Sequence, residues 1–162
     1  MSVAIVVDSA GLDQLNTLVS RLGAAETEEL LTEIGGILAE STRERIYETK
    51  TSPDGAPWVP NREGTSILLR TGDHLYGSIA FIATNSEVEV GSNWEYAHVH
   101  QFGMTIRPVR AKRLVFRVGG EVWRARSVTI PARPFVGLSD DDEAEVIRLT
   151  TDWLGLAAAG GR

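Results

Sequence analysis

The chain has 162 residues, 43% of them hydrophobic and 23% charged, and its formal net charge is −6. Such a chain can form one domain that buries roughly 70% of the surface of its unfolded state. It has no cysteine, which excludes disulfides, thiolate metal sites and cysteine nucleophiles. Its apolar runs are far shorter than the roughly 20 residues that cross a bilayer, and its first residues lack a basic segment. We therefore expect no signal peptide, no membrane segment and assembly in the cytoplasm.

The first third of the chain predicts a short strand followed by two helices. Residues 3–7 form an apolar run typical of a strand, and leucine and valine recur at helical spacing over residues 12–22. Residues 26–48 carry the strongest helical pattern, which corresponds to a helix roughly 35 Å long. Gly35 and Gly36 interrupt that helix. Glycine weakens a helix, so we expect these two to permit the close approach of another element.

Residues 48–66 predict a long loop or arm. It contains Pro53-Asp54-Gly55, a turn signature in which proline presets φ and glycine accepts a positive φ. Loops of this length without periodicity are usually functional. Trp58 lies in this segment, and we expect it to dock either on its own domain or on a neighbouring subunit.

Beyond Ile79 the hydrophobic residues recur with a period of two, which is typical of strands. Residues 79–83 and 87–91 predict one β-hairpin, and residues 114–118 and 121–128 predict a second one. Gly119-Gly120 joins the second pair as a two-residue turn.

Counting back from that turn predicts the register of the second hairpin. Phe116 pairs with Trp123 on an apolar face, whereas Arg117 pairs with Val122 on the opposite face, which also holds the following pairs: Val115 with Arg124 and Arg113 with Arg126. One face of this hairpin is therefore expected to be apolar and the other basic.

A C-terminal helix is predicted to begin at Ser139, a favourable N-cap, with acidic residues in its first turn. Residues 157–162 are predicted to be a flexible tail. Together these elements predict a single α+β domain over residues 1–162. In it, long N-terminal helices pack on an antiparallel β-sheet of hairpins, and a helix closes the chain.

Charge is distributed unevenly along the chain. Residues 107–133 contain eight of the 16 basic residues and a single acid, Glu121, whereas acids gather in residues 8–48 and 140–145. The asymmetry predicts a partner surface. A solvated strand face is an equally consistent alternative.

The segment from Tyr96 to Gly103 suggests chemistry at first sight. On a strand, His98 and His100 would point the same way and could share a metal, but no cysteine or clustered third histidine completes a zinc site. We instead expect Tyr96, His100 and Phe102 to form a packed corner between two hairpins, with the histidines hydrogen-bonded to main-chain carbonyls. Gly103 would allow the chain to turn.

Sequence patterns typical of other enzymes are also missing or weak. The chain has no Gly-x-Ser-x-Gly elbow for a nucleophilic serine, and no phosphate-binding loop. A carboxylate pair for glycan hydrolysis could come from Glu87, Glu89 and Glu95. However, Glu87 and Glu89 lie on the expected polar face of a hairpin, where solvated acids are more common than a catalytic pair. We predict no catalytic residue, no metal and no cofactor.

Four landmarks nevertheless occur in a characteristic order. They are Ser52-Pro53-Asp54-Gly55-x-Pro57-Trp58, Leu69-x-Thr71-Gly72-x-x-Leu75-x-x-Ser78-Ile79, Tyr96-Ala97-x-x-His100-Gln101-Phe102-Gly103 and Ile130-Pro131-Ala132-Arg133-Pro134-Phe135-x-Gly137-Leu138-Ser139. In this order they resemble the phage virion morphogenesis family, the tail completion proteins of Mu-like and related tailed phages. The resemblance covers residues 51–153.

The resemblance implies a non-enzymatic structural protein of the virion, acting in tail completion and head–tail joining. It also implies a homo-oligomeric ring in the neck, a hexamer or a dodecamer, that contacts other neck, tail or connector proteins. A tail terminator or a head completion protein is the alternative within assembly proteins. An alternative of another class is a protein that contacts DNA without sequence preference through the arginine-rich segment 107–133, by phosphate contacts only.

Two groups of residues follow as candidate sites. The expected interface with a neighbour comprises Trp58, Arg113, Arg117, Arg124, Arg126, Asp140, Asp141 and Asp142. The expected structural motif comprises Tyr96, His100, Phe102, Gly103, Arg133, Pro134 and Phe135. The basic hairpin and the acidic helix start would then be complementary surfaces of adjacent subunits.

Overall fold

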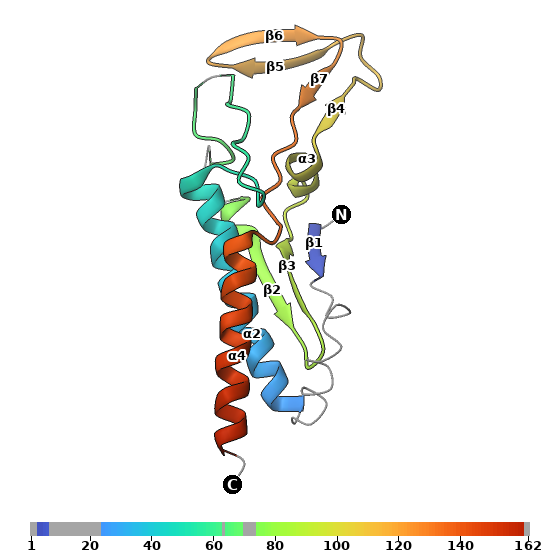
Figure 1. The fold of residues 1–162 in the computed structure, drawn as a ribbon. Coiled ribbons are helices and arrows are strands. Elements are labelled where there is room, and N and C mark those ends of the chain that lie inside the picture. Colours follow the sequence, from blue (N-terminus) through green and yellow to red (C-terminus); the bar gives the residue numbers. More distant parts are fainter. Residues whose placement is uncertain (1–2, 7–23, 63, 70–73, 161–162) are drawn as a thin grey trace.

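Two long helices and three small antiparallel sheets make up the part of the chain that a computed structural model describes: residues 3–6, 24–62, 64–69 and 74–160 (Figure 1). The elements, in chain order, are β1 (Val3–Val6), α2 (Ala24–Glu44), a π-helical turn (Arg45–Thr49), a 3-10 turn (Tyr76–Ser78), β2 (Ile79–Ala83), β3 (Val88–Ser92), α3 (Ala97–Phe102), β4 (Met104–Ile106), β5 (Leu114–Val118), β6 (Glu121–Ala125), β7 (Val128–Ile130) and α4 (Asp140–Gly160). The predicted α+β class with a C-terminal helix is confirmed. The helix predicted over residues 12–22 lies outside the described residues.

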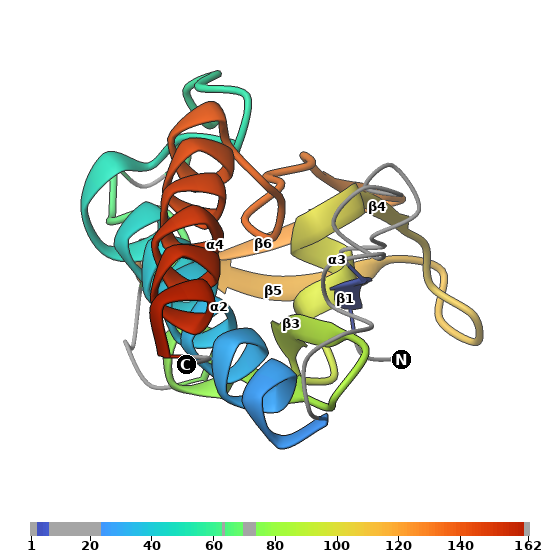
Figure 2. The same ribbon diagram turned by 60° about the horizontal axis from the view of Figure 1, so that its bottom comes forward.

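The predicted long helix forms the centre of the fold. Helix α2 packs on β2 and β3 and also contacts α4, which runs beside it in both views (Figures 1 and 2). The apolar stripe that predicts this packing is buried at Leu30, Ile34, Leu38 and, in the π-helical turn, Ile46. Residues at this spacing share one face of a helix, so the stripe forms the core between α2 and the sheet.

Of the two glycines in α2, only one permits a close approach. A Cβ atom at Gly35 would lie 2.4 Å from Cδ2 of Phe81 and 2.9 Å from Cγ2 of Val88, whereas a Cβ at Gly36 would meet nothing within 4 Å. Gly35 therefore lets the helix lie directly on the sheet, as predicted. For Gly36 the prediction is wrong.

The predicted hairpins are present, but they do not form one sheet. Strands β2 and β3 pair with each other, and β1 adds to the other edge of β3; β5 pairs with β6, and β4 pairs with β7. In β5–β6, Phe116 faces Trp123 and Val115 faces Arg124, as the turn predicts. The strand predicted over residues 121–128 is divided, because β6 ends at Ala125 and β7 leaves the hairpin to pair with β4. The predicted pairing of Arg113 with Arg126 therefore lies beyond the ladder.

The molecule has two parts. The body contains the helices and the β1-β3-β2 sheet. Residues 104–130 project from it as two short antiparallel ribbons (Figure 1), and from here on the word arm refers to these residues and not to the segment 48–66. Every buried residue of the hydrophobic core cluster lies in the body. The arm is thus built outside the core, on strands that pair only with each other.

Helix α4 completes the body. It packs on the core through Val146, Leu149 and Trp153, and its backbone is helical as far as Gly160. Residues 157–160 therefore belong to the helix rather than to the predicted tail, and residues 161–162 lie outside the described part. None of the described helices is long and apolar enough to span a membrane.

Candidate assembly interface

Sequence landmarks that lie far apart in the chain meet at one junction between the body and the arm. The indole nitrogen of Trp58 donates a hydrogen bond to the carbonyl oxygen of Pro134 at 3.0 Å. Arg133 donates through Nε and Nη2 to the carbonyl oxygen of Val59 at 2.9 and 2.8 Å. Trp58 is only 5% exposed, so it docks on its own domain. The prediction that it contacts a neighbouring subunit is wrong.

The side chain of Gln101 holds the same junction from α3. Its Oε1 accepts hydrogen bonds from the main-chain nitrogens of Phe135 (3.0 Å) and Val136 (3.1 Å), and its Nε2 donates to the carbonyl oxygen of Val136 (2.9 Å). All three residues are buried. One amide therefore satisfies three main-chain groups that would otherwise be left unpaired in the interior. The predicted packing of Phe135 is confirmed, whereas the role of Gln101 was not predicted.

The Pro-Asp-Gly turn reaches the junction through Pro53. A Cβ atom at Gly137 would lie 2.4 Å from Cγ of Pro53, so only glycine fits at position 137 unless the proline shifts. The turn itself is closed by a hydrogen bond from Gly55 N to Ser52 O at 2.9 Å. We use the name motif junction for the cluster of Pro53, Trp58, Gln101, Arg133, Pro134, Phe135, Val136 and Gly137.

A buried ion pair joins the motif junction to α4. Arg45 follows α2 and pairs with Asp142 of α4, and its Nη1 donates to the carbonyl oxygen of Gly137 at 3.0 Å. The Asp142 carboxylate accepts hydrogen bonds from the Ser139 main-chain nitrogen at 2.9 Å and from the Ser139 hydroxyl at 2.7 Å, and that hydroxyl accepts from the Asp142 main-chain nitrogen at 3.2 Å. Ser139 is therefore the N-cap of α4, as predicted, in the reciprocal arrangement of a capping box.

The Asp142 carboxylate is neutralised by a partner inside its own subunit. Burial acts to raise the pKa of Asp142, but hydrogen bonds from Ser41 and Ser139 and the charge of Arg45 outweigh it, so the pKa lies below its ordinary value. The carboxylate is 6% exposed. The prediction that Asp142 belongs to an interface is wrong, because it faces the interior. The sequence spacing indicates only that Arg45, seven residues after buried Leu38, lies on the buried face of the helix, and it does not identify Asp142 as the partner.

The segment with His98 and His100 is a short helix, α3, and not a strand. The strand geometry that would let the two imidazoles share a metal is therefore absent, because residues two apart on a helix do not face each other. Their Nδ1 atoms are buried without a hydrogen-bond partner among the described residues, so the predicted bonds to main-chain carbonyls are absent there. No three His, Cys, Asp or Glu side chains gather as a metal site in that part of the chain.

His100 is held by stacking. Its ring lies against Trp94 with centroids 5.6 Å apart and planes 11° apart, and its carbonyl oxygen accepts a hydrogen bond from Arg133 N at 2.7 Å. Burial and the nearby charge of Arg133 lower the pKa of His100. The predicted packing of His100 is thus confirmed, with an aromatic neighbour as its main contact.

Tyr96 and Phe102 lie largely on the surface, although the Tyr96 ring meets Trp94 edge-on with centroids 5.5 Å apart. They are 52% and 70% exposed, so the prediction that they pack inside a corner is wrong. The helical turn of α3 directs Ala97, Val99 and Gln101 inward instead. Gly103 ends the helix with φ of 71°, and a Cβ there would lie 2.8 Å from the main-chain nitrogen of Ala132. The predicted turn at Gly103 is confirmed, with a close backbone approach as an additional reason for glycine.

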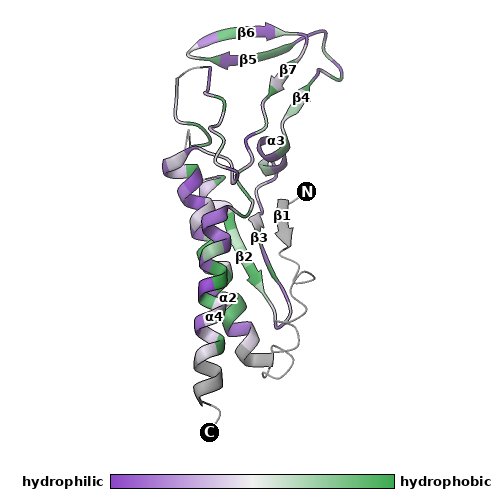
Figure 3. Ribbon diagram, viewed as in Figure 1, coloured by the Kyte–Doolittle hydropathy of each residue, from purple (hydrophilic) through white to green (hydrophobic). Residues whose placement is uncertain are grey.

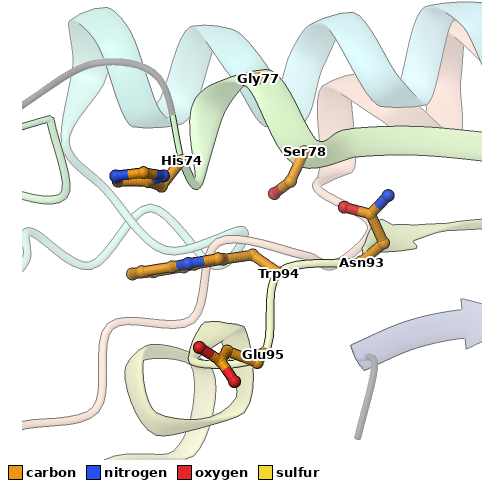
Figure 4. Close-up of a pocket in the computed structure, with 6 residues that line it drawn as sticks. All are labelled: His74, Gly77, Ser78, Asn93, Trp94 and Glu95. Carbon is orange, nitrogen blue, oxygen red and sulfur yellow. The ribbon is translucent and has the colours of Figure 1, made fainter.

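A shallow pocket beside α3 offers no arrangement for catalysis. It is lined by His74, Gly77, Ser78, Asn93, Trp94 and Glu95 (Figure 4). The Ser78 hydroxyl is 2.7 Å from the Leu75 carbonyl oxygen and 2.6 Å from the Ser92 hydroxyl. His74 stacks on Trp94, with centroids 6.0 Å apart. The Ser78 hydroxyl is thus engaged in hydrogen bonds, and His74 and Trp94 form the aromatic side of the pocket.

The arm concentrates exposed positive charge. Residues 104–130 hold seven basic residues and one acid, while the rest of the chain has nine basic and 21 acidic residues. The predicted interface arginines of the arm are all exposed: Arg113, Arg117, Arg124 and Arg126. Both hydrophobic and hydrophilic residues occur along β5 and β6 (Figure 3).

The two faces of β5–β6 differ less than predicted. Phe116 and Trp123 lie on the face nearer the body, where the guanidinium of Arg62 sits 4.6 Å from the centroid of the Trp123 ring. The opposite face carries Val115 and Val122 together with its arginines, and these valines are 63% and 55% exposed. The predicted basic face is therefore a mixed basic and aliphatic face.

Acidic side chains are exposed at the start of α4. Asp140 and Asp141 lie on the surface, as their predicted interface role requires, and Glu143 is also exposed. Leu138 and Ile147 flank them and are 40% and 57% exposed. The subunit thus presents a basic arm and an acidic helix start on separate surfaces.

Comparisons with known proteins agree with the sequence landmarks. The model of the phage virion morphogenesis family matches residues 7–155. The chain is 29% identical over 156 residues to "Mu-like prophage FluMu G protein 2" of Haemophilus influenzae. The aligned region covers 94% of this chain and 97% of that protein. No solved structure gives a significant match. The resemblance seen in the sequence is confirmed, and the role of the protein is structural, in phage virion morphogenesis. The chain belongs to the phage virion morphogenesis family.

Proposed function

We propose that this protein acts in tail completion and head–tail joining of a tailed phage, as a subunit of a ring in the virion neck. The observation that carries the proposal is the division of the subunit into a packed body and an arm that lies outside the core. A segment with exposed aliphatic and basic side chains and no core of its own is typical of an assembly contact.

A ring requires heterologous contacts, in which one surface of a subunit meets a different surface of the next. The basic arm and the acidic start of α4 are two such surfaces on one chain. The motif junction supports this use, because its buried hydrogen bonds to Val59, Pro134 and Val136 fix where the arm leaves the body. A fixed arm can define the angle between neighbours.

The relative in Haemophilus influenzae bears the words "Mu-like prophage" in its name, which favours a phage of that kind as the source of the chain. Nothing in the described geometry supplies an activated nucleophile or a metal cluster. We therefore propose a role that depends on contacts alone.

The experiment is deletion of the coding sequence from the phage that carries it, followed by electron microscopy of the lysate. The expected result is DNA-filled heads beside complete but unattached tails. Expression of the wild-type chain from a plasmid should restore joined particles. Tails of irregular length would favour a tail terminator instead, and emptied heads would favour a head completion protein. Intact infectious virions would contradict all three assembly roles.

A further inference from the structure

The outer face of the β5–β6 hairpin is a compact exposed patch of four side chains. Val115 lies opposite Arg124, and Arg117 lies opposite Val122, so the four occupy one face of the ladder in a checkerboard. All four are exposed, the valines by 63% and 55%. Each arginine therefore has an aliphatic neighbour across the strand pair.

Within the described residues, the hairpin is a two-stranded sheet that pairs with no further strand. Its contact with Arg62, through the Trp123 ring, lies on its inner face. A two-stranded hairpin is marginal in water, and a third strand or a packed neighbour is usually needed to stabilise it. The outer face is the side on which such a neighbour can add.

The composition of the patch favours a protein partner over nucleic acid. Arginines alone would suit phosphates, but exposed valines gain nothing from a phosphate backbone. Aliphatic side chains that alternate with arginine are typical of protein interfaces, where arginine is enriched and the centre is desolvated. The partner must supply carboxylates and aliphatic groups at similar spacing.

Such a surface exists on the same chain. Asp140, Glu143 and Ile147 lie at positions i, i+3 and i+7 of α4 and therefore share one face of the helix. All three are exposed, Ile147 by 57%. Asp142, by contrast, points inward to Arg45. The first two turns of α4 thus present two carboxylates and one aliphatic side chain outward.

We propose that the outer face of the β5–β6 hairpin docks on the first two turns of α4 in a second copy of this chain. The inference rests on the proposed assembly function and names the contact between its subunits. The opposite charges of the two surfaces steer the contact, and Val115 and Val122 desolvate it against Ile147. Because the hairpin face and the start of α4 are different surfaces of the subunit, each subunit can bind one neighbour through its hairpin and a second neighbour through its α4.

The first test exchanges the charges. Two variants, Arg117→Glu/Arg124→Glu and Asp140→Lys/Glu143→Lys, are each expected to weaken self-association by about tenfold or more in sedimentation velocity at low salt. Their equimolar mixture should associate again, because each mixed pair has one restored contact. The matched control is Glu29→Lys/Glu33→Lys on α2, which makes the same change of charge on exposed acids of another helix and should associate like the wild type. Far-UV circular dichroism checks that each variant is folded.

The second test uses the absence of native cysteine. With Val122→Cys and Ile147→Cys together, oxidation should give a ladder of dimers, trimers and larger species on a non-reducing gel, both in the purified protein and in assembled particles. Either substitution alone should give no ladder. A wild-type protein that stays monomeric in solution, combined with no ladder in particles, would overturn the proposal.

The remaining outcomes separate this inference from its alternatives. If Arg117→Glu/Arg124→Glu leaves association intact and instead abolishes salt-dependent retention of random duplex DNA, the hairpin binds DNA and the proposed contact is wrong. If deletion of the coding sequence leaves heads joined to tails, the proposed function fails even where the cross-linked ladder is present. If deletion blocks joining but the mixture of reversed variants does not associate, only the contact fails.

Discussion

Gln101 illustrates how a single side chain can hold two distant segments together. It makes three hydrogen bonds with the main chain of Phe135 and Val136 in the interior. The variant Gln101→Leu keeps a similar volume but leaves those main-chain groups unpaired, at about 1–3 kcal/mol each. We expect the free energy of unfolding in urea to fall by roughly 2–4 kcal/mol, because partial relaxation reduces the sum.

Phe102→Ala is the control for that measurement, since this neighbour in α3 is 70% exposed. Its free energy of unfolding should stay within about 0.5 kcal/mol of the wild type. Equal effects of the two substitutions would show that the amide does not hold the junction.

His100 should make stability depend on pH. Burial and Arg133 lower its pKa in the folded protein below the ordinary value of 6.5. The unfolded chain therefore binds the proton first as the pH falls, and the folded state loses stability below about pH 6.5. In urea unfolding between pH 8 and pH 5, His100→Phe should lose less stability than the wild type, because phenylalanine can stack on Trp94 but does not titrate. Parallel profiles for the two proteins would rule out His100 as the cause.

At the scale of the element, α2 contains a matched pair of glycines. Gly35→Ala places a methyl group 2.4 Å from Phe81, so it should destabilise the protein by about 1–3 kcal/mol through overpacking. Gly36→Ala meets nothing within 4 Å and should stabilise the helix by up to about 1 kcal/mol. Thermal melts of both variants measure the difference. A stabilising Gly35→Ala would show that the helix does not lie directly on the sheet.

The sequence predicts elements well where their pattern is local. The stripe of α2, the β2–β3 hairpin and the register of β5–β6 all follow from spacing within one segment. The split of β6 from β7 does not, because β7 pairs with β4, more than 20 residues earlier. Helix α3 was also missed, since six residues are too few for a helical period to stand out.

The candidate site was harder to predict than the fold. The order of the landmarks identifies the residues of the motif junction. Only the folded chain shows that Trp58 and Gln101 bind the main chain of residues 134–136, and that Arg133 binds the main chain beside Trp58. Asp142 looked like its exposed neighbours, because its partner, Arg45, lies 97 positions away in the chain. Burial of polar residues depends on such long-range pairs, which no local pattern specifies.

At the scale of the whole molecule, the arm should be separable from the body. Ile106 of β4 lies directly opposite Val128 of β7, so a two-residue Asn-Gly turn can replace residues 107–127 and close a short hairpin. No buried core residue is removed. We expect the melting temperature to change by only a few degrees, as the lost contact of Arg62 with Trp123 contributes about 0.5–1 kcal/mol. Self-association should be lost.

Differential scanning calorimetry and sedimentation velocity measure these two properties on the same sample. If the shortened protein fails to fold, the arm belongs to the folding unit. If it folds and still associates, the subunit contact lies elsewhere on the body.

The location of the arm outside the hydrophobic core also bears on how such proteins diverge. A core residue can change only when its neighbours accommodate the new volume, whereas residues 107–127 contribute no buried residue to the core cluster. Phages could exchange this segment by recombination without disturbing the fold that receives it. Relatives should therefore differ most in this segment, and each arm should vary together with the helix start of its own chain, which would keep subunits of coinfecting phages from joining one ring.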